Sequence, residues 1–149
     1  MKNNTVTLHR VLKASSEKVF RAFADPLATS SWFPPNGFLC QVHEMDFKVG
    51  GQFRMSFVNF STENSQSFGG VFLEIRPNEF IKYKDKFDDP ALPGEITTTI
   101  SLNAVSAGTE LRIEQTNIPE FIPADMCYLG WQECLEKLKR LVEPEIPDA

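Results

Sequence analysis

The sequence lacks a long apolar run. No stretch approaches the roughly 18 consecutive apolar residues that a membrane-spanning helix needs, and the N-terminal segment MKNNTVTLHRV has no apolar region of the kind found in secretory signals. We therefore expect no membrane span and a cytoplasmic location. The 149 residues suffice for one core, so we expect residues 1–149 to form a single domain.

Cysteine and histidine are scarce. Cys40, Cys127 and Cys134 are odd in number and form no CxxC motif; the last two lie seven residues apart on a predicted helix, about 10 Å along its axis, which is too far for a disulfide. The two histidines, His9 and His43, form no HxxxH pair. We predict free thiols, no metal site, no cofactor and no catalytic residue.

Positive charge is in deficit. Fifteen Lys and Arg residues against twenty Asp and Glu residues leave a net charge of -5, which is the wrong sign for a protein that binds the phosphate backbone of nucleic acids. Aromatic residues with a polar group are also few, at two Tyr and two Trp against thirteen Phe. Phe rings pack on apolar surfaces, so we expect a large apolar interior and no nucleic-acid partner.

The first part of the chain predicts a strand and two short helices. Residues 4–13 alternate between apolar and polar side chains, as in a strand with one buried side. A short helix follows, and Asp-Pro at 25–26 ends it and begins a second one. Pro-Pro at 34–35 stops the second helix directly after Trp32 and Phe33. We expect these two aromatic side chains to close one end of a cavity.

Strand patterns fill about the next eighty residues, and short turns between them predict an antiparallel meander. The alternating segments are 38–48, 52–60, 68–75, 80–87, 95–104 and 109–117. The segment ADMCYLGWQECLEKLKRLVE then predicts a long amphipathic helix. Its apolar face has two parts: a stripe of Cys127, Trp131, Cys134, Leu138 and Leu141, and beside it Tyr128, Leu135 and Val142. Pro144 ends this helix, and residues 143–149 are expected to be a frayed tail.

Several motifs together resemble one family. They are VLKASSEKVFRAFADP, SWFPP, VGGQFR, GGVFLEIRPNEFIKY and GWQECLEKLKRLVE. In order and spacing, over residues 6–143, the chain resembles the START-like (SRPBCC, birch-pollen-allergen-like) superfamily, in the branch named after the activator of heat-shock protein 90 ATPase. The activator itself is a larger protein in which this domain follows another, so the resemblance does not transfer chaperone activation.

The resemblance implies an α+β helix-grip fold. In that fold a curved antiparallel sheet of about six or seven strands wraps around a long C-terminal helix, and two short helices follow the first strand. A hollow between the sheet and the helix is the expected binding site.

Polar residues on the apolar faces of strands mark candidate binding positions. By strand alternation Arg10, Asp85 and Gln115 fall on the apolar side, where polar groups need partners. Arg10 and Asp85 either pair with each other or with the backbone, or a bulge turns them outward, or these residues orient a ligand in an apolar pocket. His43 shares a face with Met45, so it either looks into the hollow or is a hydrogen-bonded strand histidine.

The remaining candidate ligand contacts are mostly apolar, and the alternative for each is plain core packing. They are Trp32, Phe33, Phe53, Met55, Phe57, Tyr83, Met126 and Gly130. Gly130 interrupts the long helix at a cost near 1 kcal/mol, which indicates that the sheet or a ligand approaches it closely.

Three functions stay open at this point. The superfamily resemblance favours non-enzymatic binding of a small hydrophobic molecule, such as a lipid, a polyketide or a flavonoid-like aromatic, by a monomer or weak dimer. The alternative is a protein-interaction or co-chaperone-like module that binds a protein partner. A cyclase-like or dehydratase-like enzyme, known among wider relatives, is the least favoured because no catalytic residues support it.

Overall fold

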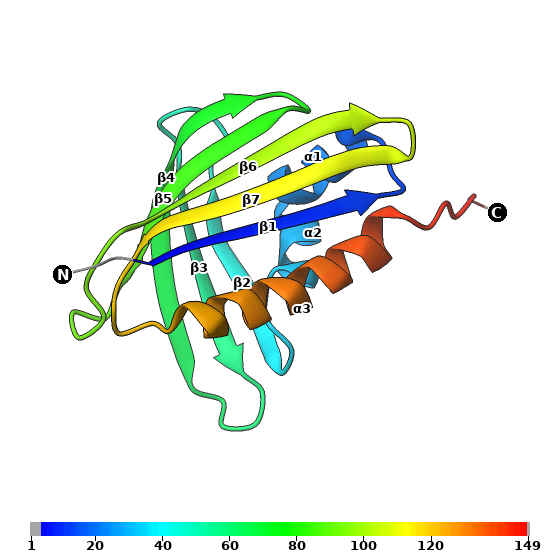
Figure 1. The fold of residues 1–149 in the computed structure, drawn as a ribbon. Helices are drawn as coiled ribbons and strands as arrows, with labels where there is room; N and C mark the ends of the chain where they lie inside the picture. The colour runs from blue at the N-terminus through cyan, green and yellow to red at the C-terminus, as the bar shows by residue number, and fades with distance from the viewer. Residues whose placement is uncertain (1–3, 149) are drawn as a thin grey trace.

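One curved antiparallel sheet organises the protein. The computed structural model describes residues 4–148, and within them seven strands pair in the order β1-β7-β6-β5-β4-β3-β2 (Figure 1). Neighbours in this order are antiparallel, so β1 and β2 are the two edges. The strands are β1 (Asn4–Leu12), β2 (Phe38–Met45), β3 (Gln52–Asn59), β4 (Ser65–Arg76), β5 (Phe80–Phe87), β6 (Ile96–Val105) and β7 (Gly108–Ile118).

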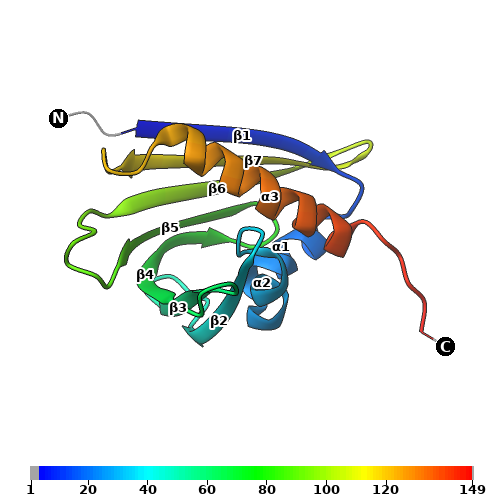
Figure 2. The same ribbon diagram turned by 90° about the horizontal axis from the view of Figure 1, so that it is seen from below.

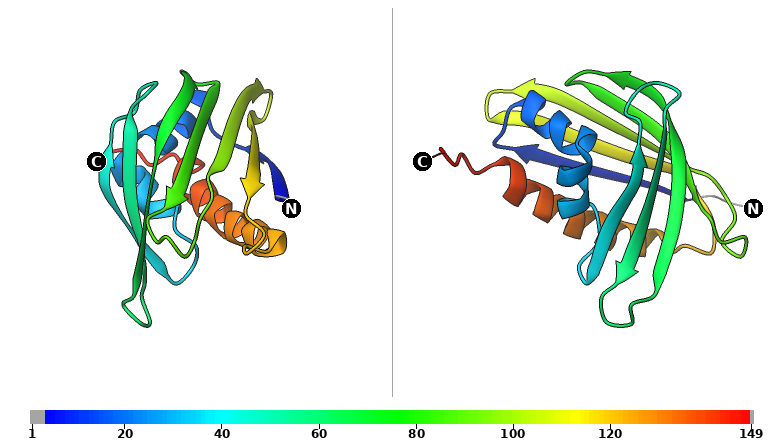
Figure 3. Two further views of the ribbon diagram at one scale, coloured as in Figure 1. Left: turned by 90° about the vertical axis from the view of Figure 1, so that its left-hand side faces the viewer. Right: turned by 180° about the vertical axis from the view of Figure 1, so that it is seen from behind.

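The helices lie on the concave side of the sheet. The sheet bends around α3 (Ala124–Val142), as the view from below shows (Figure 2). The short helices α1 (Ser16–Ala24) and α2 (Pro26–Trp32) contact α3, and α2 also packs against β2 (Figure 3). The helix-grip fold implied by the resemblance is therefore confirmed.

Local sequence signals explain where the short helices begin. The Ser15 hydroxyl accepts a hydrogen bond from the Lys18 amide at 3.2 Å and caps α1. The Asp25 carboxylate accepts one from the Leu27 amide at 2.9 Å and caps α2, which has Pro26 at its first position. These caps satisfy amides that have no partner inside the helix.

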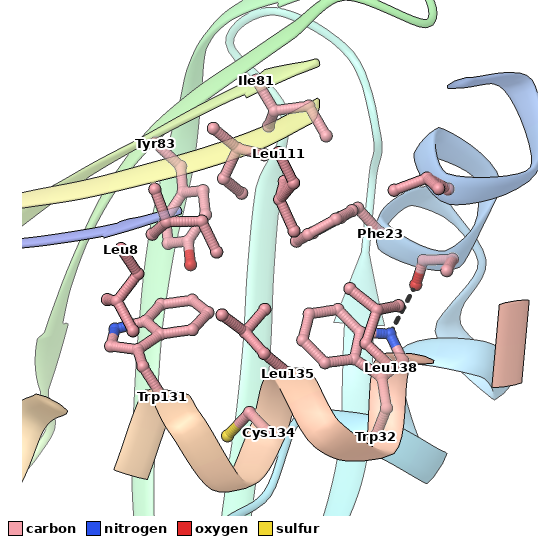
Figure 4. Packing of buried hydrophobic residues seen from close by; sticks show 14 of the residues in the cluster. Leu8, Phe23, Trp32, Ile81, Tyr83, Leu111, Trp131, Cys134, Leu135 and Leu138 are labelled. Atoms are coloured by element: carbon pink, nitrogen blue, oxygen red, sulfur yellow. Dashed lines mark hydrogen bonds between the residues drawn. The ribbon is translucent and has the colours of Figure 1, made fainter. Parts of the chain in front are cut away.

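The buried face of α3 differs from the predicted stripe at one end. Trp131, Leu135, Leu138 and Val142 are buried against the sheet (Figure 4), whereas Leu141 is 42% exposed. A seven-residue repeat drifts by about 20° per heptad around a straight helix, so a stripe that starts at residue 127 rotates out of the interface by residue 141. The pattern i, i+4, i+7, i+11 describes the actual contact face.

Trp32 belongs to the core. Its side chain is 1% exposed, and its indole Nε1 donates a hydrogen bond to the Ala22 carbonyl at 2.9 Å (Figure 4). The ring meets that of Phe23 edge-on at a centroid distance of 4.8 Å. Trp32 is therefore a core residue that also borders a small hollow, and the next residue, Phe33, borders that hollow and a larger one.

Candidate ligand-binding site

A cavity of about 240 Å³ lies between the sheet and the first half of α3. Its wall is mostly apolar. The apolar wall residues are Phe33, Pro35, Phe57, Phe68, Phe87, Ile96, Ile122, Gly130 and Trp131. The polar or titratable wall residues are Asp85, Lys86, Gln115, Cys127 and Cys134. A concave, apolar site with few polar groups is typical of small-molecule binding sites.

Aromatic rings from three elements form one continuous wall. The ring of Phe33, which follows α2, stands edge-on to those of Phe57 and Trp131 at centroid distances of 5.8 and 6.0 Å. Phe57 in turn meets Phe68 at 5.0 Å. Edge-to-face contacts of this kind fix ring orientation, so the wall presents a defined aromatic surface.

Gly130 widens the cavity on the helix side. Cys127, Gly130, Trp131 and Cys134 all line the cavity, at the spacing of one helix face. A methyl group built on Gly130 would meet nothing within 4 Å. The sheet therefore does not approach this glycine closely, contrary to one interpretation of the sequence, and the missing side chain adds free space.

Asp85 is the acidic group of the cavity wall. It is half-buried in β5, and no described residue between 4 and 148 forms a hydrogen bond or ion pair with its carboxyl group. Burial raises the pKa of Asp85 from 3.8 to about 7, because an apolar surrounding disfavours the charged form. Within the described residues Arg10 does not pair with Asp85, which excludes one of the alternatives that the sequence left open.

Close packing on β4 holds Asp85 in this orientation. Gly70 pairs with Asp85 across the sheet, and a methyl group on Gly70 would come within 2.7 Å of the Asp85 Cβ and 2.8 Å of the Phe53 ring. Only glycine leaves room for both side chains on the concave face.

Gln115 shares a polar chain with two buried residues. Its amide nitrogen donates to the Thr98 hydroxyl at 3.1 Å, and Thr98 is fully buried. The Tyr83 hydroxyl also bonds to Thr98, while burial and the nearby Asp85 raise the pKa of Tyr83 well above its ordinary value. The bond to Thr98 uses one of the two N–H donors of the Gln115 amide, so its carbonyl oxygen and its second N–H are left for a ligand.

A second, much smaller hollow of about 30 Å³ adjoins the first. Its wall residues are Phe23, Thr29, Trp32, Phe33, Met45, Phe53, Met55, Phe72 and Tyr83. This volume is close to that of one water molecule. Phe33 is a wall residue of both hollows.

Side chains of α3 hold the loop that carries Phe33. The Cys134 thiol donates to the Phe33 carbonyl at 2.9 Å, and the Lys137 ammonium donates to the Pro34 carbonyl. The Glu133 carboxylate accepts a hydrogen bond from the Asn36 amide at 3.0 Å. The backbone at this wall is therefore tied to the long helix.

Comparison with known proteins identifies the family. The family model described as "Activator of Hsp90 ATPase homolog 1-like protein" matches residues 13–143. The chain belongs to this family. No curated protein matches the chain significantly.

Solved structures share the fold of this chain. A protein from Chromobacterium violaceum is 51% identical, with a TM-score of 0.94 over 95% of this chain and 99% of that one. A protein from Nitrosomonas europaea is 24% identical, with a TM-score of 0.77 over 92% of each chain. One from Rhodobacter sphaeroides is 18% identical, with a TM-score of 0.80 over 92% of this chain and 90% of that one. The last two show the fold alone.

The predicted site residues of this family member separate into three groups. Phe33, Phe57, Asp85, Gln115 and Gly130 line the large cavity. Trp32, Phe53, Met55 and Tyr83 line the small hollow, together with Phe33. Arg10, His43 and Met126 line neither.

A strand irregularity explains why His43 does not line either hollow. The β2–β3 register shifts between Val42 and Glu44, so a β-bulge at His43 reverses the alternation counted back from Met45. His43 is exposed and its Nε2 lies 2.7 Å from the Ser56 hydroxyl, which corresponds to the hydrogen-bonded alternative.

Arg10 and Met126 stay outside the two hollows for different reasons. Arg10 is on the inward side of β1, but its guanidinium folds back and donates to the His9 carbonyl at 2.9 Å. Met126 lies in the first turn of α3 and is 59% exposed. It is one residue before Cys127, which is the position that faces the cavity.

Several wall residues of the large cavity were not predicted from the sequence. Phe87 was detectable, because it shares the alternation of Tyr83 and Asp85 in β5. Pro35 and Ile122 come from loops, which carry no periodic signal.

Among residues 4–148, no group of three or more His, Cys, Asp or Glu side chains is placed to hold a metal ion. Within the same residues, no helix combines the length and apolar character needed to cross a membrane.

Proposed function

We propose that this protein binds a small, mostly apolar molecule in the cavity between the sheet and α3, without catalysing a reaction on it. The observation that carries the proposal is the volume of about 240 Å³ inside a mostly apolar wall. This volume corresponds to roughly eight water molecules at about 30 Å³ each. It favours a one-ring or two-ring aromatic molecule, or a short acyl chain, over a complete lipid.

The two tryptophans provide a test with an internal control. Trp131 lines the large cavity, whereas Trp32 does not. In the Trp32→Phe variant the remaining fluorophore is Trp131, and the neutral probe 2-phenylethanol should change its emission in a saturable way. In Trp131→Phe the same titration should leave the emission of Trp32 nearly constant. A response that follows Trp32, or no saturable response in either variant, contradicts the proposal.

A pair of substitutions at Gly130 tests the location independently. Gly130→Leu fills space that the glycine leaves empty and should abolish probe binding measured by calorimetry. The matched control Gly130→Ala adds one methyl group, gains up to about 1 kcal/mol of helix propensity, and should retain most of the binding. Equal affinities in the two variants would place the ligand elsewhere.

A protein partner is the second candidate, and one surface feature favours it. Phe38 and Leu39 on the edge strand β2 are 37% and 54% exposed, and Phe60, which directly follows β3, is 73% exposed. The Phe60 amide donates to the Gly37 carbonyl at 3.0 Å, so the three side chains lie at one corner of the sheet. Exposed apolar groups at a sheet edge are typical of protein contacts. A complex lost in Leu39→Glu but retained in Gly130→Leu would favour this function.

A further inference from the structure

We propose that the cavity selects molecules that carry a protonated amine, which pairs with Asp85, next to an aromatic or short apolar body. This inference rests on the proposed function, because it names the chemical class of the ligand in the same cavity. It is carried by the arrangement of polar groups in the wall.

The acidic group of the cavity lacks a positive partner. No described residue forms an ion pair or hydrogen bond with the Asp85 carboxyl, although a charge held among apolar groups is costly without one. Lys86 also lines the cavity, but it is exposed and forms no ion pair within the described residues. A ligand ammonium would supply the missing partner in a charge-assisted hydrogen bond.

The groups that face Asp85 from other elements do not supply a positive charge. The neighbouring positions in the sheet are Gly70 on β4 and Ile96 on β6. Across the cavity, α3 presents Cys127 and Cys134. Burial raises the pKa of both thiols, that of Cys134 to about 12, so they are neutral at physiological pH. On β5 itself, Tyr83 is neutral because its pKa is also raised.

The second polar group of the wall supplies a further acceptor for a ligand donor. Gln115 uses one N–H of its amide for Thr98, which leaves its carbonyl oxygen as an acceptor beside one remaining N–H. An ionised carboxylate and a carbonyl both accept hydrogen bonds, and an ammonium group donates up to three. The rings of Phe33, Phe57 and Trp131 line the same cavity and would pack against the apolar body of the ligand.

Ionisation of Asp85 makes the selectivity depend on pH. The pKa of Asp85 is about 7 in the unliganded protein, so the carboxyl group is mostly neutral at about pH 5.5 and mostly ionised at about pH 8. A ligand that is cationic at both values gains its partner only when Asp85 is ionised. Its affinity should therefore rise with pH through this range, while that of a neutral ligand should not.

Three probes of matched size test the inference: phenethylamine, 2-phenylethanol and phenylacetate. Binding is measured by calorimetry at about pH 5.5 and about pH 8, with Trp131 emission as a second readout. At the higher pH phenethylamine should bind roughly tenfold or more tightly than 2-phenylethanol, the size expected for a hydrogen bond to a charged group. Phenylacetate should bind the most weakly, because it repels the carboxylate.

Two variants assign the effect to Asp85. Asp85→Asn should remove the preference for phenethylamine and its pH dependence while retaining 2-phenylethanol. The control Glu95→Gln removes a carboxylate that lies outside the cavity wall and within 3.8 Å of Lys84, and it should keep the preference.

The outcomes separate the two proposals. Equal affinity for phenethylamine and 2-phenylethanol in the unmodified protein, or a preference that survives Asp85→Asn, overturns the amine inference and leaves apolar binding intact. Failure of all three probes to bind overturns the proposed function, and the inference fails with it.

Discussion

Replacing Asp85 with Asn should stabilise the free protein at about pH 8 and have little effect at about pH 4. The folded state raises the pKa of this carboxyl from 3.8 to about 7, so between these values the folded protein holds a proton that the unfolded chain has released. Stability then falls as pH rises from about 4 to about 7 and stays reduced above that range. Asn cannot ionise, so the variant avoids this loss.

The size of the effect follows from the shift. One pKa unit corresponds to about 1.4 kcal/mol, so a shift from 3.8 to about 7 gives an upper limit of about 4 kcal/mol. Asp85 is only half-buried and borders a cavity, so solvent screens part of the charge. We expect a gain of about 2 kcal/mol at about pH 8.

Urea unfolding followed by tryptophan fluorescence measures this gain, with both proteins studied at both pH values. Groups that titrate equally in the two proteins cancel in the difference. Glu95→Gln is the control for removing a negative charge from the neighbouring surface. A gain for Asp85→Asn that is the same at both pH values, or a loss at about pH 8, would refute the reasoning about an uncompensated carboxyl.

Two further predictions concern the tryptophans and the thiols. Trp32→Ala and Trp131→Ala should each lower the free energy of unfolding by about 3 to 5 kcal/mol, the range for a large buried aromatic side chain. Of the two, only Trp131→Ala should also weaken 2-phenylethanol binding. Weaker binding by Trp32→Ala, under conditions in which that variant is fully folded, would contradict the assignment of the cavity wall. Burial raises the pKa values of Cys40, Cys127 and Cys134. A thiol reagent at about pH 8 should therefore react slowly with the native protein and should label three thiols after unfolding. Labelling of one thiol would indicate a disulfide.

Much of the fold was predictable because its signals are periodic. The alternation of Ile81, Tyr83 and Asp85 in β5 identified their shared inward side, and the helical spacing of Trp131 and Leu138 identified the face of α3 that grips the sheet. These patterns persist along an element, because each element buries one face over its whole length.

The candidate site was less predictable because local irregularities break those periods. A single bulge at His43 reverses the alternation of half a strand, and drift around a straight helix exposes Leu141. Trp32 and Phe33 are neighbours in sequence, but the end of α2 directs one into the core and the other to the cavity wall. Alternation also placed Arg10 inward without indicating that its long side chain folds back to its own backbone.

Phe33 is a wall residue of both hollows, and its main chain is anchored. Cys134 and Lys137 of α3 hold the carbonyls of Phe33 and Pro34, so rotation of the Phe33 ring would disturb fewer contacts than displacement of the loop. Under the proposed function, a ligand that fits the larger hollow would leave the ring at rest, whereas a longer one would have to turn it to use the further 30 Å³. The Phe33 ring would then limit ligand length, separately from the recognition of charge.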